Sequence, residues 1–154
     1  MTWTRCCAIW VALGCLGAIQ PAHAGQADRL TSVRSLACTF TLQATGTWTD
    51  GIPEATLDES TVSFQFESID TQEATAEVVG PFGPSHIITR ATAHYLHFVQ
   101  MFGAGPLYTT TIFNRETVDG KLMAVHTRHE FTDVSLIGFT SRPEQYYGDC
   151  EVGQ

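Results

Sequence analysis

Apolar and polar residues alternate with a period of two over residues 36–49, LACTFTLQATGTWT. The even positions from Leu36 to Trp48 are apolar or Gly, whereas the odd positions after Ala37 are Thr or Gln. Only a β-strand places alternate residues on opposite faces, so the pattern predicts a long strand with its even residues against the core. Gly46 interrupts the apolar row, and we expect a bend or bulge there.

Runs of alternating, β-branched or aromatic residues continue along the chain, at residues 60–68, 72–79, 85–90, 95–101, 107–114, 122–131 and 146–152, with a short run at 135–139. Turn-forming residues separate these runs, and none has the helical period. The registers predict that Trp48, Phe64 and Phe66 are buried while Gln65 and Glu67 are exposed, as is Thr47. The fold class is therefore all-β: a single antiparallel β-barrel or β-sandwich of about seven or eight strands.

The first 24 residues have the pattern of a secretory signal peptide. A short segment containing Arg5 precedes an uncharged apolar run, and Ala22 and Ala24 supply the small residues that signal peptidase requires. A membrane anchor needs about 17 or more apolar residues, but Pro21 and two glycines interrupt this run. We predict a signal peptide over residues 1–24, a flexible arm or single helical turn over 25–35, and one all-β domain over 36–154.

The cysteines predict one disulfide. Three of the five leave with the signal peptide, and only Cys38 and Cys150 remain. A single pair in an exported protein is typical of a disulfide, which here would join the first strand to the last segment. A pair of catalytic or metal-binding thiols is the alternative, which export disfavours.

The charge balance limits the partners. The whole chain has a formal net charge of −8, and removing Arg5 with the signal peptide leaves seven basic against sixteen acidic residues, or −9. Nucleic acids and anionic membranes are bound through an excess of Lys and Arg, so we expect neither as a partner. An acidic surface is compatible with a cationic protein partner, although solubility alone also explains it.

Candidate chemistry is sparse, and we predict no catalytic residues, cofactor or metal. His126, Arg128 and Glu130 share one face of a predicted strand, and we interpret them as a solvated polar surface cluster. The alternative is a binding or acid–base site. Histidines three residues apart, at 94 and 97 and at 126 and 129, point to opposite faces of a strand and cannot jointly hold a metal without a bulge.

Aromatic residues allow a second interpretation of the interior. Core filling is their ordinary role, but an eight-stranded barrel can also hold one small apolar molecule. The candidates to line such a cavity are Trp48, Phe64, Phe66, Phe98 and Phe131.

Two short stretches carry a resemblance to known proteins. Gly46, Thr47 and Trp48 resemble the G-x-W motif on the first strand of lipocalins and related calycin barrels, although here alternation precedes it for about ten residues. Residues 141–150, which contain SRP, QYYG and Cys150, look like the tail of small, uncharacterised exported bacterial β-proteins. The resemblance implies an exported, disulfide-bonded β-domain that is lipocalin-like, and it implies no catalytic residues.

Three functions follow as hypotheses. The first is an exported, periplasmic or secreted, non-enzymatic β-domain that binds a small apolar ligand or a protein partner. The second is an acidic inhibitor of a cationic secreted enzyme such as lysozyme. The third is a hydrolase with an unrecognised site on the face of His126 and Glu130.

Overall fold

The computed structural model describes residues 29–80, 83–103, 105–130 and 142–153. It contains eight strands: β1 (Leu36–Thr49), β2 (Ile52–Asp70), β3 (Thr75–Gly80), β4 (Gly83–Ala91), β5 (Tyr95–Met101), β6 (Leu107–Glu116), β7 (Leu122–His129) and β8 (Glu144–Val152). The signal peptide predicted at 1–24 and the short strand at 135–139 lie outside the described residues. No helix within the described part of the chain is long and apolar enough to span a membrane.

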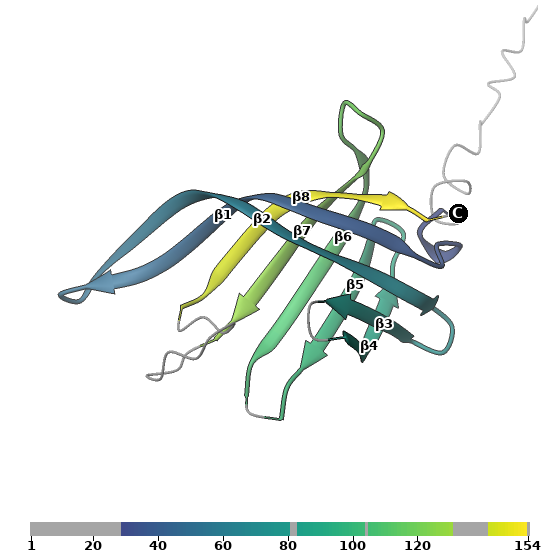
Figure 1. Cartoon of the computed structure of the whole chain (residues 1–154), viewed down its shortest axis with the longest axis horizontal. Coiled ribbons are helices and arrows are strands. Elements are labelled where there is room, and N and C mark those ends of the chain that lie inside the picture. Colours follow the sequence, from purple (N-terminus) through teal and green to yellow (C-terminus); the bar gives the residue numbers. More distant parts are fainter. Residues whose placement is uncertain (1–28, 81–82, 104, 131–141, 154) are drawn as a thin grey trace, which may run out of the picture.

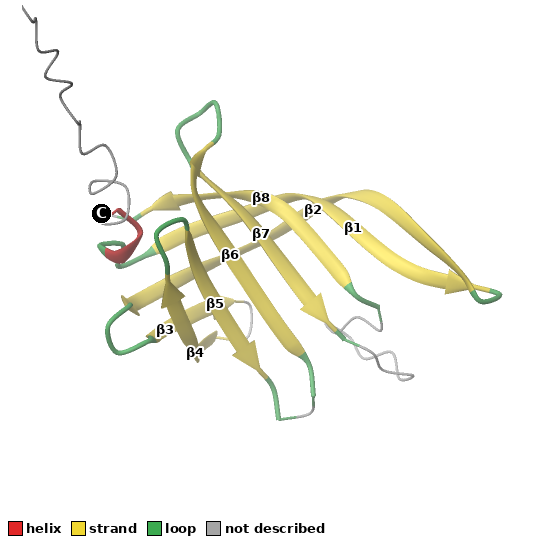
Figure 2. Cartoon of the chain, turned by 180° about the vertical axis from the view of Figure 1, so that it is seen from behind, coloured by secondary structure: helices red, strands yellow, loops and turns green. Residues whose placement is uncertain are grey.

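Every strand pairs antiparallel with the next one along the chain, and β8 pairs back with β1. The sheet therefore closes into one barrel (Figures 1 and 2). This confirms the all-β prediction and selects the barrel over the sandwich. We call the end of the barrel at which β1 begins the basal end, and the opposite end the distal end.

The basal end is filled by apolar side chains. Residues 29–31 form a single helical turn. Leu30 within the turn and Val33 just after it are buried in the same core as Phe66, Phe98 and residues of every other strand. The backbone of Arg34 accepts a hydrogen bond from Ile69 N–H at 3.1 Å, which ties the turn to the end of β2. Of the two alternatives for residues 25–35, the structure has the single helical turn at 29–31, because burying Leu30 and Val33 offsets the entropy of ordering it.

The predicted disulfide is confirmed. Cys38 and Cys150 are direct partners in the β1–β8 ladder, both buried, and their sulfur atoms are bonded. The bond lies at the seam where the last strand closes the barrel onto the first. Because the two cysteines have a sequence separation of 112, the chain-entropy model assigns the crosslink about 4–5 kcal/mol of stabilisation.

The register of β1 changes in the middle of the strand. Phe40 pairs with Gly148 of β8, but Leu42 pairs with Tyr147, so Thr41 is an extra residue on β1. Such a bulge moves all later residues to the opposite face. Phe40 is fully buried, whereas Leu42 is 40% and Trp48 is 61% exposed. The prediction that Trp48 is buried is wrong for this reason, while Phe66, Gln65 and Glu67 lie as predicted and Phe64 is partly buried.

Gly148, rather than Gly46, is the glycine that the bulge requires. A Cβ atom on Gly148 would lie 2.0 Å from the carbonyl oxygen of Thr39 and 2.6 Å from Cα of Phe40. A Cβ atom on Gly46 would meet nothing within 4 Å. The bulge predicted at Gly46 is therefore placed wrongly: the two backbones come into close contact at Phe40, five or six residues earlier.

Beyond the bulge, β1 and β2 continue past the rest of the barrel as a two-stranded ribbon (Figure 1). The last residue of β1 that pairs with β8 is Thr45, and β2 pairs with β3 only from Gln65 onward. Asp50 and Gly51 connect the strands with φ of 51° and 81°, the positive values of the two-residue turn that Asp-Gly favours. We call residues 46–60 the outer ribbon.

Candidate ligand-binding site

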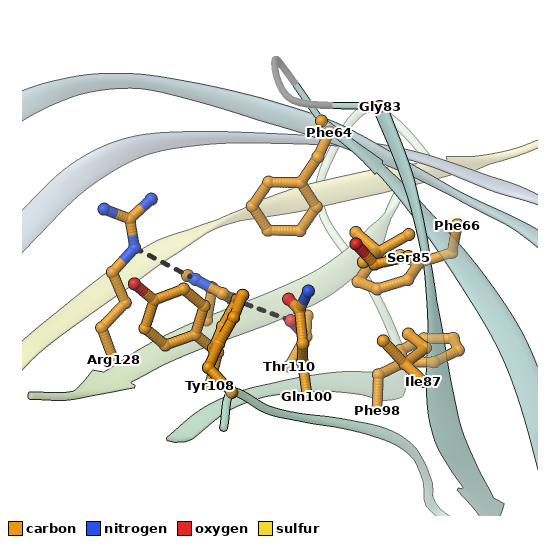
Figure 3. A pocket seen from close by; sticks show the side chains of 14 residues that line it. Phe64, Phe66, Gly83, Ser85, Ile87, Phe98, Gln100, Tyr108, Thr110 and Arg128 are labelled. Atoms are coloured by element: carbon orange, nitrogen blue, oxygen red, sulfur yellow. Dashed lines mark hydrogen bonds between the residues drawn. The ribbon is translucent and has the colours of Figure 1, made fainter. Parts of the chain in front are cut away.

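A cavity of about 410 Å³ lies in the distal half of the barrel (Figure 3). Six strands from β2 to β7, together with Phe102 in the loop after β5, supply the lining side chains. Its lining consists of Phe64, Phe66, Val78, Gly80, Gly83, Ser85, Ile87, Phe98, Gln100, Phe102, Tyr108, Thr110, His126 and Arg128. The cavity is built by the inward-facing residues of the sheet, so its walls are as ordered as the barrel itself.

Aromatic rings form the apolar side of the cavity. Phe66 and Phe98 stack with ring centroids 4.0 Å apart and planes inclined by 7°, and both are buried. Phe64 meets Phe66 edge to face at 5.4 Å. These pairs separate the cavity from the packed basal core and offer flat apolar surface to a bound molecule.

His126 lies on β7 and meets Phe64 edge to face, with ring centroids 4.8 Å apart. It is 5% exposed, and its Nδ1 is 2.8 Å from the hydroxyl oxygen of Thr110. Arg128 Nε donates to His126 Nε2 at 3.4 Å, so a neutral ring carries its proton on Nδ1 and donates it to Thr110. Burial, and to a lesser extent the Arg128 charge, lowers the pKa of His126 to about 3. The imidazole is therefore neutral at physiological pH.

Arg128 is held between two aromatic rings and beside a carboxylate. The guanidinium carbon is 5.4 Å from the ring centroid of Tyr108 and 5.0 Å from that of Tyr146. Its Nη1 is 4.0 Å from Glu144 Oε2. Rings on two sides fix the orientation of the planar guanidinium, which cation–π attraction stabilises.

Two tyrosine hydroxyls complete the polar cluster. Tyr108 donates to Glu130, and Tyr146 donates to Glu144. Burial, followed by the hydrogen bond to Glu144, raises the pKa of Tyr146. Both carboxylates are buried, and each is compensated by a hydrogen-bond donor, as buried charges must be.

The predicted surface cluster of His126, Arg128 and Glu130 is wrong in its placement. The three residues do share one face of β7, but that face is the interior: Glu130 is 1% exposed, and Arg128 lines the cavity. A barrel that encloses a cavity can place polar side chains inside when they bond to one another. The alternation along β7 could have predicted this placement, because Leu122 and Ala124 lie on the same face as His126 and are buried apolar residues.

The other candidates separate into two groups. Phe64, Phe66 and Phe98 line the cavity as the second interpretation of the aromatics predicted, whereas Trp48 lies on the outer ribbon. Phe131 lies outside the described residues. Of the paired histidines, His97 Nδ1 lies 3.0 Å from the hydroxyl oxygen of Thr111, and the described residues contain no group of three or more metal-binding side chains.

Comparison with models of known protein families, with curated proteins and with solved structures found no match in any of the three. The functional argument therefore depends on the geometry of the site alone.

Proposed function

We propose that this protein is an exported, non-enzymatic barrel that binds one small, apolar, uncharged molecule in the distal cavity. The observation that carries the proposal is a partly open cavity of about 410 Å³ whose lining combines stacked phenylalanines with a few convergent polar groups. Ligand sites have this composition and range from about 300 to 1,000 Å³. The N-terminal signal pattern and the disulfide support export.

The polar wall favours an uncharged ligand. The positive charge of Arg128 is already offset by Glu144, and the buried Glu130 lies on the same wall. Glu130 and Glu144 contact the lining residues Tyr108 and Arg128, so both carboxylates would repel an anionic ligand, and the guanidinium would repel a cationic one. A carbonyl or hydroxyl oxygen on an otherwise apolar molecule can accept a hydrogen bond from the guanidinium of Arg128 without either repulsion.

The protonation state of His126 supports binding rather than acid–base catalysis. A general base works best when its pKa lies near the working pH. Burial holds the pKa of His126 at about 3, so the ring has little tendency to accept a proton at neutral pH. Its Nε2 already accepts from Arg128, which leaves that nitrogen occupied.

Titration with N-phenyl-1-naphthylamine, a neutral apolar fluorophore, tests the proposal. We expect a saturable rise in fluorescence with one site per chain. Ser85→Phe should abolish it, because Ser85 lines the cavity and a phenyl ring there would fill the space. Circular dichroism and thermal melting establish that this variant is folded.

Ser63→Phe is the matched control, since Ser63 is an exposed strand residue that does not line the cavity. It should bind the fluorophore as the unmodified protein does, and so should Trp48→Ala. Absence of saturable binding, or equal binding by folded Ser85→Phe, would refute the proposed function.

A further inference from the structure

We infer that the outer ribbon is a docking surface for a basic protein, and that Trp48 is its apolar anchor. This inference is independent of the cavity. It combines an apolar stripe on the outside of the molecule with an outer ribbon whose charged side chains are all acidic.

The apolar stripe follows from the bulge at Thr41. Residues paired directly across two strands share a face, and every second pair returns to that face. Tyr147 pairs with Leu42, and both are exposed on the outer surface. The β1–β2 pairs on the same face as Leu42 are Ala44 with Leu57, Gly46 with Ala55, and Trp48 with Pro53.

This outer stripe is long and uncovered by the described residues. Trp48 is 61% and Leu57 is 69% exposed, and Tyr147 is 39% exposed at the other end of the row. Thr45 and Thr47, which follow the bulge, lie on the opposite face of the ribbon together with Glu54 and Asp58. A contiguous apolar row on an isolated two-stranded ribbon is neither core nor ordinary surface, and it is typical of an interaction site.

The charged side chains of the outer ribbon are all acidic, and they lie on both of its faces: Glu59 pairs with Leu42 on the face of the stripe, whereas Glu54 and Asp58 lie on the other face. Residues 35–89 contain no Lys or Arg, although they contain half of the sixteen acidic residues of the chain. Four of these acidic residues lie on the outer ribbon: Asp50, Glu54, Asp58 and Glu59. No ion pair joins them to any described residue.

The negative charge of the outer ribbon indicates which class of partner covers the stripe. Two ribbons packed stripe to stripe would bring into contact two segments that each carry four carboxylates and no basic side chain, which opposes a dimer formed in this way. The anionic surface of a membrane is repelled for the same reason. A basic protein with an apolar hollow fits both features: its rim meets Glu59 beside the stripe and is attracted by the carboxylates of the turn and of the other ribbon face, and the hollow accepts the indole of Trp48.

Two basic proteins serve as probes, egg-white lysozyme and bovine ribonuclease A. Ribonuclease A contains no tryptophan, and Trp48 is the sole tryptophan of residues 25–154, so its emission reports contact directly. Calorimetry measures the lysozyme titration. At an ionic strength of about 0.02 M we expect at least one probe to bind, ribonuclease A with a blue shift of Trp48 emission or lysozyme with a saturable heat of binding. We expect binding to be lost near 0.5 M salt.

Substitutions separate the electrostatic contribution of the carboxylates from the apolar contribution of Trp48. The triple variant Glu54→Gln, Asp58→Asn, Glu59→Gln should weaken binding at least tenfold at low salt. The control Glu67→Gln, Glu73→Gln, Glu77→Gln removes the same charge from the barrel wall and should change the affinity less than threefold. Trp48→Ala should weaken binding at least tenfold with the net charge unchanged, and its exposed position leaves the fold intact.

Three results would overturn the inference. The first is that neither probe binds at low salt. The second is that both triple variants lose affinity equally, which would make the interaction a matter of net charge alone. The third is Trp48-dependent dimerisation in sedimentation, or Trp48-dependent binding to phosphatidylglycerol vesicles, since either assigns the stripe to another occupant.

Discussion

The two halves of the β1–β2 hairpin have the same sequence pattern but opposite environments. From Leu36 to Phe40 the even residues of β1 are buried in the barrel, and from Leu42 to Trp48 the even residues lie on the outer surface. The two halves differ by one extra residue, Thr41, in the ladder with β8. Alternation therefore identifies a strand, but it does not determine which face meets the core once a bulge intervenes.

The two halves of the molecule also contribute to different properties, the basal half to stability and the distal half to binding. The basal half contains the disulfide, the N-terminal turn and the packed phenylalanines, which hold the barrel together. The distal half contains the cavity and the outer ribbon, where apolar surface is left without a described partner. Substitutions in the two halves should accordingly act on different observables.

The largest contrast should come from Phe40→Ala and Trp48→Ala, two aromatic deletions on the same strand. Phe40 is fully buried, with ring centroids 5.3 Å from Phe64 and 5.7 Å from His126. Its loss should lower the free energy of unfolding by about 3–5 kcal/mol in urea denaturation. Trp48→Ala should change it by less than about 0.5 kcal/mol, because the side chain is exposed. Equal losses would mean that the ribbon packs against the barrel.

The next effect tests the bulge itself through Gly148→Ala. The new methyl group would overlap the backbone of Thr39 and Phe40, so β1 and β8 must separate locally. We expect a loss of roughly 1–3 kcal/mol or more in the free energy of unfolding, measured by thermal or urea denaturation. Gly46→Ala is the matched control and should be nearly neutral, as its Cβ meets nothing within 4 Å. A neutral Gly148→Ala would show that the strands approach less closely than described.

The smallest effect concerns the polar wall, measured as stability against pH. His126 is neutral in the folded protein because burial lowers its pKa to about 3, whereas in the unfolded chain it protonates below about pH 6.5. The unfolded state therefore binds the extra proton as the pH falls, and this residue should remove about 2 kcal/mol of stability between pH 7 and pH 5.

His126→Gln should abolish that part of the pH dependence, whatever it does to stability at pH 7. His86→Gln is the control, since the ring of His86 is 91% exposed and its removal should leave the pH profile unchanged. The same pH dependence in His126→Gln and the unmodified protein would contradict a buried, neutral imidazole.

Much of the fold could be predicted from local patterns. The limits of β5 agree with the predicted run, and the disulfide follows from counting cysteines after the signal pattern is removed. The errors share one cause, which is register. Trp48 was assigned to the core across an unseen bulge, and His126 and Glu130 were assigned to the surface because polar side chains were expected outside. Both errors concern the face of a strand, which is set by neighbouring strands that are distant in sequence.

The sequence by itself determined that the chain is all-β, that Cys38 and Cys150 are the pair that closes it, and that residues 35–89 contain eight acidic residues and no Lys or Arg. These are properties of composition, of a period of two, and of the count of cysteines. Only the tertiary structure decided where the two faces of each strand lie, because a face becomes inside or outside when the sheet closes. Closure between β1 and β8 required a glycine at 148 and an extra residue at Thr41. That single extra residue placed the even residues of β1 from Leu42 to Trp48 on the outer surface instead of in the core. Closure of the sheet placed His126, Arg128 and Glu130 in the interior, beside the cavity.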